Sequence, residues 1–140
     1  MAKKTTLSGL FLPQLTFEGT VYSGRGTGKN FVALSWVKQQ IIRNIGFPPY
    51  YGTLNIRLTE QSKDKKKQLE TKQGFVVEPQ TGYHSGILFH AQISGLKCAV
   101  ILPLVLNYPS DLLEIIAPQY LRGKLGLKDG DRVTVVVTVS

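Results

Sequence analysis

Short stretches of alternating apolar and polar residues recur along the chain, and each is typical of a β-strand with one buried face. The clearest lies near the C-terminal end, where four valines alternate with mostly polar residues over positions 133–139, after the tight turn 128–131. Residues 53–58 have the same two-residue period. Further strands are predicted at residues 15–22, 31–34, 74–77, 86–93 and 99–102.

The spacing of apolar residues changes to that of a helix between positions 37 and 45, where three of them recur every four residues. This spacing predicts a helix over residues 36–45, with Ser35 as its N-cap and Gly46 as its end. A second, short helix is predicted to begin at Ser110 or Asp111 and to run through residue 116, followed by a further turn over 119–125.

Residues 62–72 are strongly charged and have neither period, so they are predicted to form a solvated loop. Many short strands, one long helix and glycine-rich turns together predict a mainly β protein with one or two helices, folded as a small closed β-barrel. The length of 140 residues suits a single domain, and 42% hydrophobic with 19% charged residues is ordinary globular composition.

The net charge of the chain bears only on the kinds of partner that it could bind. Seventeen Lys and Arg against nine Asp and Glu give a formal charge of +8, which favours nucleotides, nucleic acid or acidic membranes without choosing among them. The single cysteine, Cys98, lies in an apolar run, so it is predicted to be a core residue and the compartment to be the cytoplasm. Neither a signal peptide nor a membrane-crossing run is expected.

The most suggestive segment for chemistry is the loop Gly24-Arg25-Gly26-Thr27-Gly28-Lys29. Alternating glycines let backbone N–H groups turn toward an anion, and the two basic residues supply charge, so the loop suits phosphate; a plain flexible hairpin loop is the alternative. Its glycine spacing fits neither a P-loop nor a dinucleotide fingerprint. His84 and His90 have no partners at metal-ligand spacing and indicate no zinc site.

Four segments, in this order and spacing, resemble the CTP-dependent riboflavin kinases of archaea. They are Ser23-Gly24-x-Gly26-x-Gly28, Gly46-Phe47-x-Pro49-Tyr50-x-Gly52-Thr53-Leu54-Asn55, Glu114-Ile115-Ile116-Ala117-Pro118, and Leu121-Arg122 with Leu127-Lys128-Asp129-Gly130-Asp131. The resemblance implies a six-stranded cradle-loop barrel, related to riboflavin-synthase-like and swapped-hairpin barrels. It implies transfer of the γ-phosphoryl group of CTP to the 5′-hydroxyl of riboflavin, giving FMN and CDP.

The resemblance also implies roles for particular residues. The glycine loop 24–29 matches the family's contact to the CTP phosphates, and a second nucleotide-contacting segment matches Tyr120, Leu121, Arg122 and Gly123. Thr53 and Asn55 match the pair that holds Mg²⁺, and because they are two apart on a predicted strand they share one face. Asn107 and Glu114 match the two positions at which the family makes polar contacts to the flavin. Glu114 is also the candidate catalytic residue, as a hydrogen-bond acceptor or a general base for the ribityl hydroxyl.

Two positions depart from the family pattern: Asn107 stands where a Thr is expected, and Gly123 replaces an acidic residue. Family members often carry a DNA-binding winged helix before the barrel, whereas residues 1–140 are expected to form the barrel domain alone. Partners are expected to be riboflavin and CTP, with no nucleic acid, membrane or obligatory protein partner. The alternatives are a basic barrel that binds nucleic acid through Arg25, Lys29, Arg57 and Arg122, or an inactive flavin- or nucleotide-binding relative.

Overall fold

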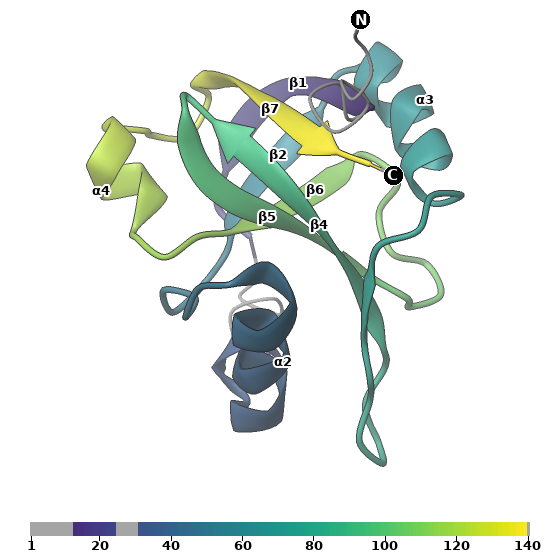
Figure 1. Cartoon of the computed structure of the whole chain (residues 1–140). Helices are drawn as coiled ribbons and strands as arrows, with labels where there is room; N and C mark the ends of the chain where they lie inside the picture. The colour runs from purple at the N-terminus through teal and green to yellow at the C-terminus, as the bar shows by residue number, and fades with distance from the viewer. Residues whose placement is uncertain (1–12, 25–30, 140) are drawn as a thin grey trace, which may run out of the picture.

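A closed antiparallel β-barrel forms the body of the molecule in the computed structural model, which describes residues 13–24 and 31–139. Figure 1 shows the barrel with α2 below it, α3 at its upper right and α4 at its left. The strands are β1 (Gln14–Tyr22), β2 (Leu54–Leu58), β3 (Phe75–Val77), β4 (Gly86–Ile93), β5 (Leu96–Pro103), β6 (Leu112–Ile116) and β7 (Arg132–Thr138), and the helices are α2 (Ser35–Ile45), α3 (Glu60–Leu69) and α4 (Leu121–Leu125).

The strands follow the order β3-β4-β5-β6-β2-β1-β7, and a further pairing of β4 with β7 closes six of them into the barrel, leaving β3 as an extra strand. In the closing pair Ala91 lies opposite Val137 and Ile93 opposite Val135. Closure removes the open edges of these six strands. The predicted mainly β, closed six-stranded barrel is confirmed.

Two apolar clusters hold the fold, one inside the barrel and one between its outer wall and α2. Strand β5 contributes to both, because Val100 points into the barrel while Ala99 and Ile101 face the helix cluster. This explains why residues 99–102 form an unbroken apolar run rather than an alternating one. Cys98 is buried in the interior cluster as predicted, and burial raises the pKa of its thiol to about 12.

Helix α2 confirms the predicted helix, with Gly46 ending it in a left-handed conformation at φ 99°. Its N-cap position is Leu34, with no side-chain hydrogen bond, so the prediction of Ser35 as N-cap is wrong. The strand predicted at residues 31–34 is also wrong, since residues 31–33 are helical. Val32 lies on this helical turn, is 1% exposed and packs in the apolar cluster beside α2. A buried apolar residue on a helical turn thus explains the strand-like pattern.

The charged stretch predicted as a loop is instead mostly helix α3. The Thr59 side chain caps it by accepting a hydrogen bond from the Ser62 backbone N–H at 3.2 Å. The helix has no apolar stripe and is attached to the barrel mainly by polar groups: Ser62 accepts from the Glu18 N–H, and Lys65 donates to the Thr16 carbonyl oxygen. Periodicity of apolar residues therefore could not reveal it.

The helix predicted to run through Ile116 is strand β6. It pairs with β2 on one side and β5 on the other, so its backbone groups bond to neighbouring strands. Leu113 and Ile115 fill the barrel while Ile116 packs against the α2 cluster, so both faces are buried and the two-residue period is lost from the sequence.

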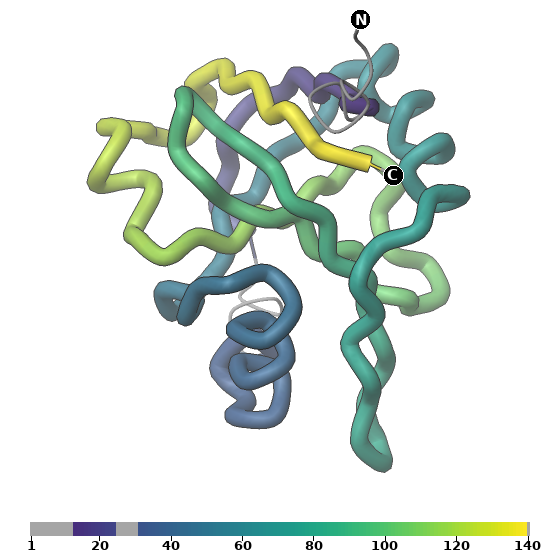
Figure 2. Tube along the Cα trace, viewed as in Figure 1, coloured from purple at the N-terminus to yellow at the C-terminus, as the bar shows by residue number. Residues whose placement is uncertain are grey.

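The segment from β3 to β4 extends beyond the barrel beside α2, as the Cα trace of Figure 2 makes clear. Trp36 of α2 contacts Tyr83 near the tip of this hairpin edge to face, with ring centroids 5.4 Å apart. In the described part of the chain no helix has the length and apolar character needed to cross a membrane.

Candidate active site

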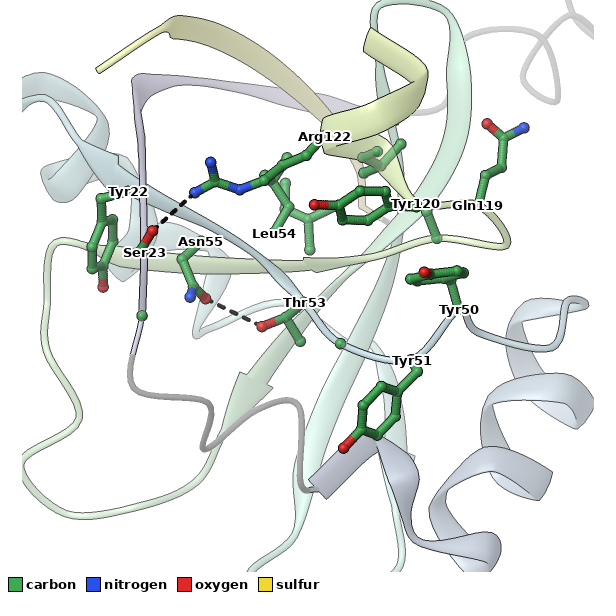
Figure 3. A pocket seen from close by; sticks show the side chains of 15 residues that line it. Tyr22, Ser23, Tyr50, Tyr51, Thr53, Leu54, Asn55, Gln119, Tyr120 and Arg122 are labelled. Atoms are coloured by element: carbon green, nitrogen blue, oxygen red, sulfur yellow. Dashed lines mark hydrogen bonds between the residues drawn. The ribbon is translucent and has the colours of Figure 1, made fainter. Parts of the chain in front are cut away.

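A cavity of about 380 Å³ opens where β1 and β6 end and where β2 and α4 begin (Figure 3). The segments that line it are far apart in the sequence: the end of β1, the residues from Tyr50 to Asn55 at the start of β2, the end of β6, and the start of α4. Its wall combines aromatic rings, hydroxyl and amide oxygens and one guanidinium group. A cleft of this size and mixture suits a small molecule with both polar and flat parts.

The polar centre of the cavity is formed by Thr53, just before β2, and by Asn55 on the outward face of that strand. The Thr53 hydroxyl lies 3.2 Å from Asn55 Oδ1 and 3.2 Å from Glu114 Oε1. Asn55 and Glu114 are opposite each other in the pairing of β2 with β6, which is why all three side chains meet. Three hard oxygen atoms thus converge at one point beside the cavity.

Gly24 passes directly over this group at the end of β1. A Cβ atom at this position would overlap the amide group of Asn55. Only glycine lets the backbone approach Asn55 this closely without moving it. The first glycine of the predicted loop therefore has a steric reason in the structure, whereas Arg25, Gly26, Thr27, Gly28 and Lys29 lie outside the described residues.

Glu114 is 5% exposed, and both of its carboxylate oxygens have partners. Thr53 donates to Oε1, and the hydroxyl of Tyr108 donates to Oε2 through a short hydrogen bond. Burial, followed by the negative charge of Glu114, raises the pKa of Tyr108 far above its ordinary value, so this hydroxyl remains a donor at any physiological pH. Two donors thus fix the orientation of the carboxylate.

On the opposite wall Arg122 of α4 binds Asp129 at 2.6 Å, and its guanidinium group also reaches Ser23 at 3.5 Å. The hydrogen bond from Arg122, then that from Ser23, lowers the pKa of the Asp129 carboxyl. Arg57 lies 3.9 Å from Asp111 and over the ring of Tyr22. Of the three arginines named for nucleic-acid binding, the two that the structure describes, Arg57 and Arg122, each lie beside a carboxylate.

Two tyrosines form an aromatic wall of the cavity: the rings of Tyr50 and Tyr120 are stacked, with centroids 5.4 Å apart and planes inclined by 28°. Figure 3 shows the two rings side by side near Arg122. A Cβ atom on Gly123 would lie 2.9 Å from the Tyr120 ring, so the glycine that departs from the family pattern leaves room for this ring.

The structure therefore brings together Gly24, Thr53, Asn55 and the segment 120–122 around one cavity. Glu114 lies behind it, joined through Thr53, and Gly123 and Asn107 are not among the described lining residues. Asn107 lies in the exposed connection from β5 to β6 with φ 65°. A β-branched Thr adopts this conformation with difficulty and Asn adopts it readily, which accounts for the second departure.

Sequence reasoning missed two residues of this site. The sequence identifies Tyr50 only as part of a motif, although an aromatic residue just before a polar strand is a usable signal for a ring-binding wall. Tyr108 could not have been found, because its contact with Glu114 depends on β6 being a strand. Among the described residues no three His, Cys, Asp or Glu side chains form a metal-binding group.

A closed barrel with a mixed polar and aromatic cavity is the kind of architecture in which small molecules bind. The family model CTP-dep_RFKase, described as domain of unknown function DUF120, matches residues 21–137. This range contains the whole site described above. The chain therefore belongs to the CTP-dependent riboflavin kinase family, and the resemblance found in its sequence is confirmed.

Curated archaeal proteins named riboflavin kinase are similar to this chain along most of its length. The protein of Archaeoglobus fulgidus is 35% identical over 127 residues, which cover 88% of this chain and 54% of the relative. That of Ignicoccus hospitalis is 35% identical and covered to 71%, and that of Methanospirillum hungatei is 37% identical and covered to 58%. The chain thus spans little more than half the length of some of these relatives.

Proposed function

We propose that this protein is a riboflavin kinase that transfers the γ-phosphoryl group of CTP to the 5′-hydroxyl of riboflavin. The observation that carries the proposal is the convergence of Gly24, Thr53, Asn55 and Arg122 on one cavity, next to a stacked pair of tyrosines. Phosphoryl transfer needs positioning and charge neutralisation more than covalent help from the protein. The family membership and the named relatives support the same reaction.

The nucleotide end of the cavity is assigned to Arg122 and to the stacked tyrosines. A guanidinium group is suited to phosphate oxygens, and Arg122 can turn from Asp129, which is largely exposed, toward an anionic ligand. The face of Tyr50 or Tyr120 offers a surface on which a pyrimidine ring can stack. The glycine loop 24–29 is assigned to the phosphates, on the basis of its sequence and of the close approach of Gly24 to Asn55.

The metal assignment rests on the donor chemistry of Thr53 and Asn55. Mg²⁺ prefers hard oxygen ligands and keeps several waters and phosphate oxygens, so a hydroxyl and an amide oxygen on one strand face fit it. When bound, Mg²⁺ would neutralise charge on the β- and γ-phosphates. Glu114 would accept a hydrogen bond from the Thr53 hydroxyl, which leaves the lone pairs of that hydroxyl directed away from the carboxylate.

The acceptor end is assigned to Asn107 and Glu114. Each carboxylate oxygen of Glu114 accepts one hydrogen bond within the protein and retains another lone pair, so it can still accept a bond from a ribityl hydroxyl. Leu104, Val105 and Leu106, which immediately precede Asn107, are exposed apolar side chains, and Leu106 is 91% exposed. Such side chains suit contact with a flat, largely apolar flavin ring.

The first test is to incubate the protein with riboflavin, Mg²⁺ and either CTP or ATP, and to measure FMN by chromatography. We expect FMN from CTP and much less from ATP, because the site has family-like nucleotide segments and no Walker pattern. Equal FMN formation from the two donors would refute the donor preference but not the kinase. Absence of FMN with either donor would refute the proposed function.

A second prediction concerns the acceptor end. Glu114→Gln should lower turnover or riboflavin affinity about tenfold while leaving CTP affinity unchanged, because the amide NH₂ cannot accept the bonds that the carboxylate accepts. Steady-state kinetics and calorimetric titration with CTP measure the two effects. Glu78→Gln, an exposed carboxylate near the β3 end, is the control. If Glu114→Gln matches the wild type in both assays, Glu114 does not belong to the site.

A further inference from the structure

A chain of buried and partly buried polar side chains runs from helix α3 to the cavity. Lys66 of α3 is 3% exposed, an uncommon position for a lysine. Its ammonium group donates to the carbonyl oxygens of Pro109 and Leu112, at 3.0 and 2.8 Å. Lys66 therefore ties down both ends of the short segment 109–112, which connects the exposed loop around Asn107 to strand β6.

The same ammonium group lies 4.7 Å from the centre of the Tyr108 ring. This is the distance of a favourable cation–π contact, so Lys66 also fixes the plane of that ring. The Tyr108 hydroxyl then donates to Glu114 Oε2, and Glu114 Oε1 accepts from Thr53. At Glu114, therefore, both hydrogen bonds point the same way: Tyr108 and Thr53 are the donors and the carboxylate is the acceptor.

The geometry points to Tyr108 as a positioning residue for Glu114, held in place by Lys66. This inference rests on the proposed riboflavin kinase activity. A carboxylate attached to β6 can rotate about its side-chain bonds, and a single donor on one oxygen would leave the other oxygen free to turn away from Thr53. With a donor on each oxygen, one orientation of the Glu114 carboxylate is selected before any substrate binds, so the group is preorganised.

A second consequence concerns the segment that carries Asn107. Because Lys66 binds the carbonyl groups of Pro109 and Leu112, and Tyr108 is bonded to Glu114, the residue after Asn107 is anchored from both sides. The two residues assigned to riboflavin, Asn107 and Glu114, are therefore linked through Tyr108. Loosening Tyr108 should disturb the acceptor end and leave the nucleotide end, built on Arg122 and the tyrosine pair, as it is.

The test is a double-mutant cycle with Tyr108→Phe and Glu114→Gln, measured by steady-state kinetics well below the melting temperature. Tyr108→Phe keeps the ring beside Lys66 and removes only the hydroxyl. We expect turnover to fall roughly tenfold, the loss expected for a hydrogen bond to a charged group, with CTP affinity unchanged. The double variant should be no slower than Glu114→Gln alone, because Tyr108 acts through the carboxylate.

The matched control is Tyr83→Phe, which removes the hydroxyl of a half-exposed tyrosine near the hairpin tip and should leave turnover unchanged. Wild-type turnover for Tyr108→Phe, or losses that multiply in the double variant, would overturn the positioning role while the kinase activity stands. No FMN from the wild type would overturn both. If Tyr108→Phe does not fold, Lys66→Met replaces it, with the same expected loss and the same lack of additivity with Glu114→Gln.

Discussion

Asn55→Ala is expected to lower the rate of FMN formation about a hundredfold while the protein remains folded. The amide oxygen of Asn55 lies beside the Thr53 hydroxyl at the cavity wall. Losing an oxygen that would help hold Mg²⁺ and the phosphates should remove transition-state stabilisation of about 3 kcal/mol, hence roughly a hundredfold in rate. Initial rates of FMN formation at low and high Mg²⁺ measure this, and partial rescue at high Mg²⁺ is expected.

Thr53→Val should cause a similar loss of activity, but with a greater cost in stability. It removes the donor to Glu114 Oε1, and a nearly buried acceptor left without a partner costs about 1–3 kcal/mol. Thr134→Val on β7 and Gln92→Ala on β4 are exposed-strand controls outside this cavity. Wild-type rates for both Asn55→Ala and Thr53→Val at low Mg²⁺ would mean that the pair is only the polar face of a strand.

Gly24→Ala should lower the rate of FMN formation nearly as much as Asn55→Ala, although it changes neither of the two side chains assigned to Mg²⁺. Its methyl group would occupy the space of the Asn55 amide, so the amide must move away from Thr53. We expect a loss of turnover on the order of a hundredfold if the amide leaves the site. Gly86→Ala is the control, because a Cβ there would meet its nearest atom, the Leu102 carbonyl oxygen, at 3.4 Å.

The combination of the two substitutions gives a sharper result. In the Gly24→Ala, Asn55→Ala double variant the truncated side chain leaves room for the new methyl group, so the double variant should be no slower than Asn55→Ala alone. Independent effects would instead multiply, giving roughly a ten-thousandfold loss from two hundredfold steps. Multiplying effects would show that Gly24 acts by a route other than the position of Asn55.

The sequence predicted the barrel because most strands bury one face and expose the other. In β2 the apolar residues Leu54, Ile56 and Leu58 point inward, and this leaves Asn55 on the outer face, as the spacing implied. The family resemblance singled out Thr53, Asn55 and the segment 120–122, and the structure places them around the same cavity. Local pattern and tertiary structure agree where burial is one-sided.

The predictions failed where the environment of a segment was not one-sided. Strand β6 is buried on both faces, so a cap-like Ser110 or Asp111 before an apolar run suggested a helix. Helix α3 differs in the opposite way, because it is held by Ser62, Lys65 and Lys66 and contributes a single apolar residue, Leu69, to the core. A charged sequence does not show which lysine is buried, so the polar chain to Glu114 could be found only in three dimensions.

The pairing of β7 with both β1 and β4 has a consequence for how this protein is made. Gln14 pairs with Thr138, so β1 cannot complete its pairing with β7 until almost the last residue of the barrel has been made. During synthesis on the ribosome the nascent chain must carry β1 and β4 with unpaired edges until β7 emerges. Such edges can join other strands, so we expect this chain to need a chaperone most in the interval before β7 emerges.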